Sequence, residues 1–319
     1  MKIRIILILG GIAIALALIS LWMGQQAYGW FPPQASLEAL LIDRLFSVLV
    51  TLGTFIFLGV VGTLTYSMLF QQAGKYDTSD GPPMEGNVTL EVVWTAIPLV
   101  LVIWIAGYSY QIYDQMSILG PMEHVHLQTQ SRGMATAVAA PLEDAAGAAI
   151  APMHPIEVHA RQWVWEFRYP DQNVTSTELH LPNNQRVKLV LQSEDVLHGF
   201  FVPAFRIKQD IIPGRVIDFE FTPIREGRYR LRDSQYSGTY FAAMQTDVVV
   251  ESSEAYQQWL ADAAAHPPVL AYNRAFDEFH RAKKNLSAGW KTVEPAPPPL
   301  VNAPSHISAN LPSGQRRQL

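Results

Sequence analysis

The 319-residue sequence contains no cysteine. A chain without cysteine cannot form a disulfide, a thiolate zinc site, an iron–sulfur cluster or a cysteine-ligated copper centre. Charged residues are scarce as well, at 16% of the chain, and the formal net charge is −5. Because the lysines and arginines are scattered rather than clustered, the sequence argues against nucleic-acid binding.

Long apolar segments dominate the first third of the chain. Three windows contain no Asp, Glu, Lys, Arg or His, at residues 5–23, 45–70 and 92–113. Each is close to the about 20 residues that cross a bilayer core, so the sequence predicts a membrane protein. The positive-inside rule places Lys2 and Arg4 in the cytoplasm and residues 114–319 outside. We expect residues 1–24 to be a retained first transmembrane helix rather than a signal peptide, although the pattern fits both.

The outer part has the pattern of an all-β domain. Residues 116–155 are predicted to be a linker with a flexible insertion rich in Ala, Gly and Pro. Alternating apolar and polar residues then predict strands at 156–169, 186–191, 199–202, 216–222, 227–231 and 246–251. Short strands at this spacing indicate an antiparallel sandwich over residues 156–265, closed by a helix at 254–264. The Pro-rich residues 266–319 are expected to be a largely disordered tail.

Four motifs follow one another in the chain. They are LEVVWTAIP from Leu90, RQWVWEFRYP from Arg161, DVLHGFFVP from Asp195 and IPGR from Ile212. Over about residues 36–261 the chain resembles subunit II of the haem–copper terminal oxidases, including cyanobacterial members. The resemblance implies a transmembrane helix hairpin at residues 36–115, preceded by an extra N-terminal helix and followed by an all-β, cupredoxin-like sandwich.

The cytochrome c oxidases of the family bind a dinuclear copper centre, and the resemblance implies which positions of this sequence correspond to its ligands. Its ligands are a histidine followed by the pattern C-x-E-x-C-x-x-x-H-x-x-M, in which two thiolates bridge the copper ions. In this sequence those positions are occupied by His198, Asp233, Gln235, Ser237, Phe241 and Met244. Only the first histidine and the methionine match, so a dinuclear thiolate centre cannot form. We expect this chain to bind no metal or other cofactor of its own.

Quinol oxidases of the same superfamily, such as the bo type, lack this copper centre too. The resemblance therefore implies subunit II of a quinol oxidase, with haems and copper in subunit I and no catalytic residue in this chain. Trp163 matches the aromatic residue that passes electrons from cytochrome c to copper in relatives. Without copper, we expect Trp163 and Trp165 to be packing groups with N–H partners. We likewise expect His198 to be hydrogen-bonded beside a packed Met244.

Glu91 is the candidate functional residue of the membrane part. In the family, the glutamate of its motif lies at the entrance of a proton pathway in subunit I. The alternative is an acid that stabilises a helix N-terminus by about 0.3–1 kcal/mol.

Gln235 replaces a glutamate that, in copper-bearing members, also helps to hold a magnesium ion at the subunit I interface.

The expected partners are subunit I, subunit III and membrane lipid, but not nucleic acid. The expected location is a bacterial plasma membrane or a thylakoid membrane, with the β-domain on the periplasmic or lumenal side. Two alternatives stay open. One is a cytochrome c oxidase subunit II with an atypical copper site, and the other is a cupredoxin-like assembly or copper-handling protein.

Overall fold

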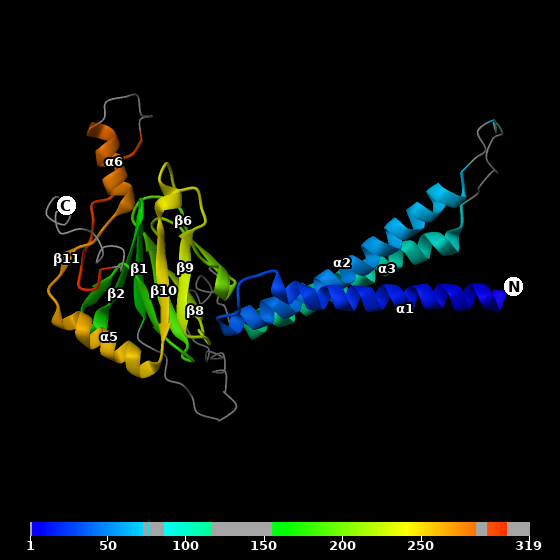
Figure 1. The fold of residues 1–319 in the computed structure, drawn as a ribbon, viewed down its shortest axis with the longest axis horizontal. Helices are drawn as coiled ribbons and strands as arrows, with labels where there is room; N and C mark the ends of the chain where they lie inside the picture. Colours follow the sequence, from blue (N-terminus) through cyan, green and yellow to red (C-terminus); the bar gives the residue numbers. More distant parts are fainter. Residues whose placement is uncertain (1, 73–75, 77–85, 117–154, 285–291, 305–319) are drawn as a thin grey trace, which may run out of the picture. The chain divides into compact units, whose positions relative to one another are not determined.

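The structure is a computed structural model that describes residues 2–72, 76, 86–116, 155–284 and 292–304. The chain forms two compact units (Figure 1). The first unit comprises residues 1–31 and 41–115, and the second comprises residues 32–40 and 116–319. The predicted insertion at 116–155 lies almost entirely outside the described residues.

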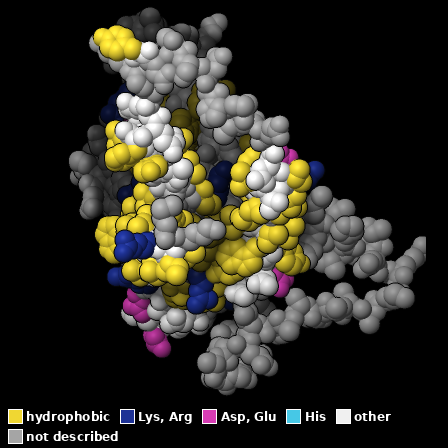
Figure 2. Space-filling model, turned by 90° about the vertical axis from the view of Figure 1, so that its right-hand side faces the viewer, with side chains coloured by type: hydrophobic (Ala, Val, Ile, Leu, Met, Phe, Trp, Pro, Cys, Tyr) yellow, Lys and Arg dark blue, Asp and Glu magenta, His cyan; other side chains and the backbone are white. Residues whose placement is uncertain are grey.

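Three long helices make up the first unit. They are α1 (Lys2–Gln26), α2 (Leu37–Phe70) and α3 (Val88–Gln115). All three are long and apolar enough to cross a membrane, as the sequence predicts. Their side chains are largely exposed, for example Phe57 at 64% and Val100 at 65%. Hydrophobic side chains accordingly make up most of the described surface in view in Figure 2. Such a surface is stable only in an apolar solvent, since burying it is worth about 25 cal/mol per Å².

The N-terminal helix packs against α2 through small residues. The Ser47 hydroxyl donates to the Gly24 carbonyl at 2.8 Å. A Cβ added at Gly24 would lie 2.9 Å from the Ser47 carbonyl oxygen and 3.3 Å from Thr51 Cβ. Glycine and serine allow this close approach, as is typical of helix contacts in membranes. Residues 2–26 therefore fold as part of the helical unit.

The second unit is a β-sandwich followed by C-terminal elements. Its strands are β1 (Ile156–Arg161), β2 (Val164–Tyr169), β3 (Val174–Ser176), β4 (Leu179–Pro182), β5 (Val187–Ser193), β6 (His198–Val202), β7 (Ile207–Ile211), β8 (Ile217–Phe221), β9 (Gly227–Asp233) and β10 (Gln245–Glu251). They form two five-stranded sheets, in the orders β3-β2-β1-β5-β8 and β4-β10-β9-β6-β7. The predicted strands at 186–191, 199–202, 216–222, 227–231 and 246–251 are confirmed, whereas short strands β3, β4 and β7 were not predicted.

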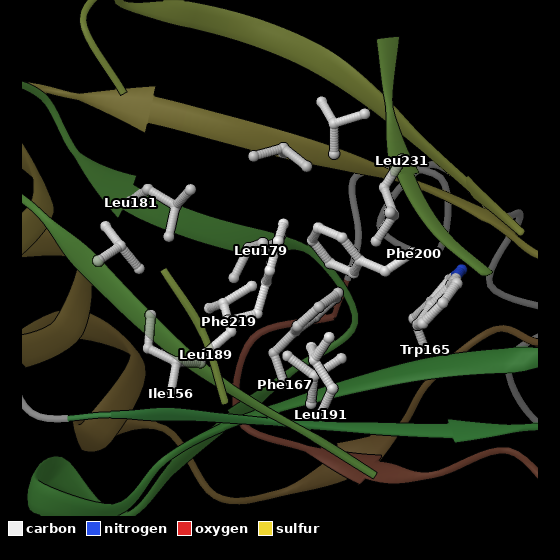
Figure 3. Packing of buried hydrophobic residues seen from close by; sticks show 14 of the residues in the cluster. Ile156, Trp165, Phe167, Leu179, Leu181, Leu189, Leu191, Phe200, Phe219 and Leu231 are labelled. Carbon is white, nitrogen blue, oxygen red and sulfur yellow. The ribbon is translucent and has the colours of Figure 1, made fainter. Parts of the chain in front are cut away.

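The core lies between the two sheets. Figure 3 shows Trp165 and Phe167 of one sheet facing Phe200 and Leu231 of the other. These side chains are at most 2% exposed. The Trp165 and Phe200 rings meet edge to face at a centroid distance of 6.0 Å, a favoured geometry for aromatic pairs. This packing fixes the ends of β6 and β9, where the candidate site lies.

The region predicted as one strand at 156–169 is a hairpin. Strands β1 and β2 pair antiparallel, with Arg161 opposite Val164. The inward-facing residues of β1 include Val158 and Ala160, whereas Phe167 is inward-facing in β2. The buried positions thus change from even to odd numbers at the turn. A continuous strand cannot change phase, because side chains alternate strictly between its two faces.

The predicted closing helix is confirmed as α5 (Ser253–Ala265). The Ser252 side chain accepts the Ala255 N–H, which caps the helix N-terminus. On the helix, Trp259 stacks on His180 of β4 at a centroid distance of 3.8 Å. The helix thereby covers the end of the sandwich at β4.

The expectation of a largely disordered tail is wrong for residues 266–284 and 292–304. They contain β11 (Val269–Leu270), α6 (Arg274–Lys284) and β12 (Leu300–Val301). Strand β3 is an edge of its sheet, and its Thr175 carbonyl accepts the N–H groups of Asn302 and Ala303. The tail is ordered here because the edge strand has unpaired backbone groups, which form hydrogen bonds with the N–H groups of the tail. The rest of the predicted tail lies outside the described residues.

Candidate functional site

A buried histidine between two carboxylates forms the centre of the candidate site. His198 begins β6 and is fully buried. Its Nδ1 lies 2.7 Å from an Asp233 carboxylate oxygen, and its Nε2 lies 2.9 Å from an Asp195 carboxylate oxygen. Both ring nitrogens are therefore engaged in hydrogen bonds. Asp195 was not assigned a role from the sequence, although its place three residues before His198 in the DVLHGFFVP motif was the available signal.

Asp233 joins three segments of the chain. One of its oxygens accepts the N–H groups of Gly199 at 2.8 Å and Gln235 at 3.0 Å. The other oxygen accepts from the Ser237 hydroxyl at 2.7 Å, in addition to its contact with His198. The carboxylate side chain has no exposed surface. These charge-assisted hydrogen bonds compensate for removing it from water.

The histidine is held toward its protonated form. Burial lowers the pKa of His198, but hydrogen bonds and charge interactions with Asp195 and Asp233 outweigh this effect and raise the pKa above its ordinary value. Burial raises the pKa of Asp195, but hydrogen bonds from His198 and from the Gln162 and Val196 amides outweigh it and hold the pKa below its ordinary value. The raised pKa of His198 and the lowered pKa of Asp195 both favour an imidazolium that lies between two carboxylates.

His198, Asp195, Asp233 and Ser237 are called the histidine cluster here. Trp163 and Trp165 lie beside it, and the N–H group of each indole donates a hydrogen bond. Trp163 donates to the Ser237 carbonyl at 3.1 Å and Trp165 to the Met244 carbonyl at 3.3 Å. Each indole is 2% exposed, and Met244 is 1% exposed. The Asp233 amide also donates to the Met244 carbonyl at 3.0 Å. Met244 thus lies next to the histidine cluster as a packed side chain.

The C-terminal segment 292–304 runs past Trp163. The Ala296 amide donates to the Gln162 carbonyl, directly before Trp163 in the chain. The hydroxyl of Thr292 donates to that of Thr239 at 2.7 Å, within the loop whose Tyr240 ring packs against Trp163 at a centroid distance of 5.2 Å. The Tyr240 loop packs on the indole, and the tail is hydrogen-bonded to this loop and to the residue before Trp163. The position of the tail was not foreseen, because its sequence suggested disorder.

Gln235 and Phe241 are the remaining two of the six positions matched to copper ligands by the sequence resemblance. Both lie at the edge of the histidine cluster. Gln235 contributes its amide to Asp233 and is partly exposed. Phe241 opens a short 3-10 helix, and its ring packs edge to face on Tyr236 at a centroid distance of 5.3 Å. Neither side chain is brought onto His198 by a contact that the structure shows.

The donor set does not fit a dinuclear copper centre. The two bridging positions are filled by Asp233 and Ser237, which hydrogen-bond to one another instead of presenting thiolates. Both nitrogens of His198 already contact carboxylates. Among the described residues, no group of three or more His, Asp or Glu side chains is arranged to hold a metal ion. Soft thiolate ligation, which such copper sites require, is missing altogether.

Glu91 lies in the first turn of α3. Asn87 caps this helix, since its side-chain oxygen accepts the Leu90 N–H at 3.1 Å. The Glu91 side chain is exposed in the described structure. This position suits both sequence interpretations, because a helix N-terminus favours an acid and an exposed acid can exchange protons. Glu91 belongs to the helical unit and is not part of the histidine cluster.

Comparison with known proteins identifies the family. The model of the cytochrome c oxidase subunit II transmembrane domain matches residues 20–112, and that of its periplasmic domain matches residues 173–253. Cytochrome c oxidase subunit 2 of Thermostichus vulcanus is 34% identical over 282 residues, covering 81% of this chain and 86% of the relative. The chain belongs to the subunit II family of the haem–copper oxidases. It is a membrane-anchored subunit with a periplasmic-type, cupredoxin-like domain.

A more distant relative is named a quinol oxidase subunit. Quinol oxidase subunit 2 of Bacillus spizizenii is 25% identical over 231 residues, covering 70% of this chain and 63% of the relative. The solved periplasmic domain of subunit II from Bradyrhizobium japonicum is 24% identical, with a TM-score of 0.33, covering 35% of this chain and 93% of that one. Family membership alone therefore leaves the electron donor undecided.

The histidine cluster of this subunit II predicts a characteristic pH dependence of stability. Because the folded pKa of His198 is raised, its contribution is complete below the ordinary value of 6.5 and is lost as pH rises through the folded pKa. Because the pKa of Asp195 is lowered, its contribution is present above the ordinary value of 3.8 and is lost as pH falls through the folded pKa. We expect the cluster to stabilise the β-domain most between these two ordinary values.

His198→Gln tests this expectation. The variant should unfold more easily near pH 6, since removing one partner of a buried charge pair typically costs about 3–5 kcal/mol. It should also lose the decline in stability above pH 6.5, as measured by near-UV circular dichroism during thermal unfolding. The exposed His266 provides the matched control, and His266→Gln should follow the wild-type profile. A His198→Gln profile parallel to wild type would contradict the assigned charge state.

Proposed function

We propose that this subunit II serves a quinol-oxidising haem–copper oxidase and carries no redox centre of its own. The observation that carries the proposal is the replacement of both bridging cysteines by the hydrogen-bonded pair Asp233 and Ser237. In this proposal quinol delivers electrons directly to subunit I, which holds the haems and copper and reduces dioxygen to water. Subunit II contributes assembly, docking and proton entry.

Overall identity is a weaker guide to the electron donor than the ligand positions. The 34% identical relative is named a cytochrome c oxidase subunit, whereas the 25% identical relative is named a quinol oxidase subunit. Identity over hundreds of residues mostly reflects the shared scaffold, and function depends on the site. The relatives' names favour, as a second candidate, a cytochrome c oxidase subunit with an atypical copper site. The absence of cysteine argues strongly against that candidate, because thiolates are the soft ligands that copper sites of this kind use.

The burial of Trp163 supports the quinol proposal. Electron transfer from a soluble protein requires close approach to the accepting group. The indole is 2% exposed and packs against the Tyr240 ring. A protein donor docked on this face would therefore find almost no exposed surface of Trp163.

The proposed setting follows from the family and the membrane helices. The partners are subunit I and subunit III, within a bacterial plasma membrane or a thylakoid membrane. The β-domain lies on the periplasmic or lumenal side, as the positive-inside rule predicts from Lys2 and Arg4.

The donor preference of the purified oxidase complex tests the proposal. We expect oxygen consumption with a short-chain quinol and none with reduced cytochrome c, each normalised to haem content. Metal analysis of the same complex should account for all its copper at subunit I. Turnover with cytochrome c comparable to that with quinol would refute the proposal and favour the second candidate.

Restoring the copper ligands tests whether the loop from Asp233 to Met244 has kept its course. The variant Asp233→Cys, Gln235→Glu, Ser237→Cys and Phe241→His should bind copper and show an intense visible absorption band. The close contacts among His198, Asp233 and Ser237 predict that the new thiolates would face the histidine. The wild-type protein in excess copper is the control and should stay colourless. A folded but colourless variant would show that the loop positions are wrongly matched.

We further propose that Glu91 is a proton-entry group for subunit I. The variant Glu91→Gln removes the titratable carboxylate and keeps the size of the side chain, so assembly should survive and haem-normalised turnover should fall. Glu91→Asp retains a carboxylate and should preserve much of the activity.

Asn87→Ala separates proton entry from helix stability. It removes the cap of α3, at a cost of about 0.5–2 kcal/mol, without removing the acid. Turnover of the assembled Asn87→Ala complex should therefore stay near wild type. Wild-type turnover in Glu91→Gln across the pH range would leave Glu91 only its helix-stabilising role.

A further inference from the structure

The chain after α5 forms a small element of its own on the β-domain. Strands β11 and β12 pair antiparallel, with Val269 opposite Val301. The Asn273 side chain accepts the Ala275 N–H at 3.0 Å at the start of α6 and donates to the Ala296 carbonyl at 3.0 Å. Ala275 and Val301 have no exposed surface. The described residues of this segment thus contact one another, and two groups of hydrogen bonds attach them to the sandwich.

The first attachment lies at the edge strand β3. The Thr175 carbonyl accepts the N–H groups of Asn302 at 2.9 Å and Ala303 at 3.1 Å, and the Thr175 amide donates to the Asn302 side chain at 3.1 Å. The Ser176 hydroxyl donates to the Ala303 carbonyl at 3.0 Å and has no exposed surface. Because these contacts act together, we expect this end of the segment to stay in place when contacts elsewhere are removed.

The second attachment joins the segment to the loop at 234–244, between β9 and β10, and to the β1–β2 turn. The Thr292 hydroxyl donates to the Thr239 hydroxyl at 2.7 Å. The Ala296 amide donates to the Gln162 carbonyl. Thr239 is exposed, so water competes for its hydrogen bond. The second attachment is therefore smaller and more accessible to water than the first.

Gln162 links the second attachment to the histidine cluster. Its carbonyl is bound to the tail, and its amide donates to the Asp195 carboxylate at 2.6 Å. Its side chain donates to the Ser237 carbonyl at 2.6 Å, within the loop. A Cβ added at the neighbouring Gly238 would lie 3.1 Å from the Gln162 Nε2 atom, so this side chain lies directly against the loop backbone. One residue thus contacts the tail, the loop and the cluster.

We propose that the segment at 292–304 is an intramolecular strap that holds the loop at 234–244 in place through Gln162. The β3 attachment is the fixed end of the strap, and the contacts of Thr292 and Ala296 are its releasable end. An ordered loop has lost conformational entropy, which its contacts must offset. In this chain hydrogen bonds provide those contacts, and Gln162 is a positioning residue for the histidine cluster. The proposal does not depend on whether quinol or cytochrome c is the electron donor.

Hydrogen–deuterium exchange of the full chain in detergent tests the proposal. The double variant Thr292→Val/Ala296→Pro removes both donors of the second attachment. Proline is compatible with position 296, because Pro297 already favours an extended backbone at the residue before it. The amides of Phe241 and Met244, whose hydrogen bonds lie inside the loop, should exchange about tenfold faster than in wild type.

The variant Gln162→Ala removes the side-chain donor alone and should also speed exchange in the loop. Gln185→Ala is the matched control, since the Gln185 side chain likewise donates a hydrogen bond, to the Ser253 hydroxyl at 3.0 Å. It should leave the loop at the wild-type rate. The imidazole NMR signals of His198 report on positioning, and they should shift in Gln162→Ala but not in Gln185→Ala.

Three results would overturn the proposal. The first is wild-type exchange of the loop amides in Thr292→Val/Ala296→Pro. The second is exchange that rises by the same factor in the loop and in the core strand β5, because the removed contacts would then support the whole domain rather than the loop. The third is an unchanged set of His198 signals in Gln162→Ala, which would separate Gln162 from the histidine cluster.

Discussion

The buried carboxylate of Asp233 determines how the loops of the candidate site are held. It has no exposed side-chain surface and accepts hydrogen bonds from Gly199, Gln235 and Ser237 while contacting His198. A buried charge without such partners would cost several kcal/mol, so the partners and the loop course depend on each other. Here charge-assisted hydrogen bonds connect the end of β9, the start of β6 and the loop after Asp233.

Asp233 and Ser237 keep the loop connected to His198, but neither side chain is a redox group. Carboxylates and an imidazolium can exchange protons through their hydrogen bonds, but these groups do not accept or release electrons. Beside the cluster, Trp163 is buried, packs against Tyr240 and donates to the Ser237 carbonyl. The interior of this β-sandwich thus holds a polar cluster that is joined by hydrogen bonds.

Sequence periodicity predicted the architecture because helix and strand patterns report burial directly. The three apolar windows, five of the strands and α5 could be read in this way. The hairpin at 156–169 was missed, although the shift of buried positions from even to odd numbers marks its turn. The tail could not be predicted, since its order depends on the distant edge strand β3, whose Thr175 carbonyl accepts its amides. Counting along the motifs identified His198 and Asp233 as site residues. The contact between His198 and Asp195 became evident only from the structure.

Asp233 and His198 lie where β9 ends and β6 begins, and this end of the strand pair is closed by packing and by internal charge pairing. Antiparallel pairing brings the start of one strand close to the end of the other, so two residues 35 positions apart in the sequence meet here.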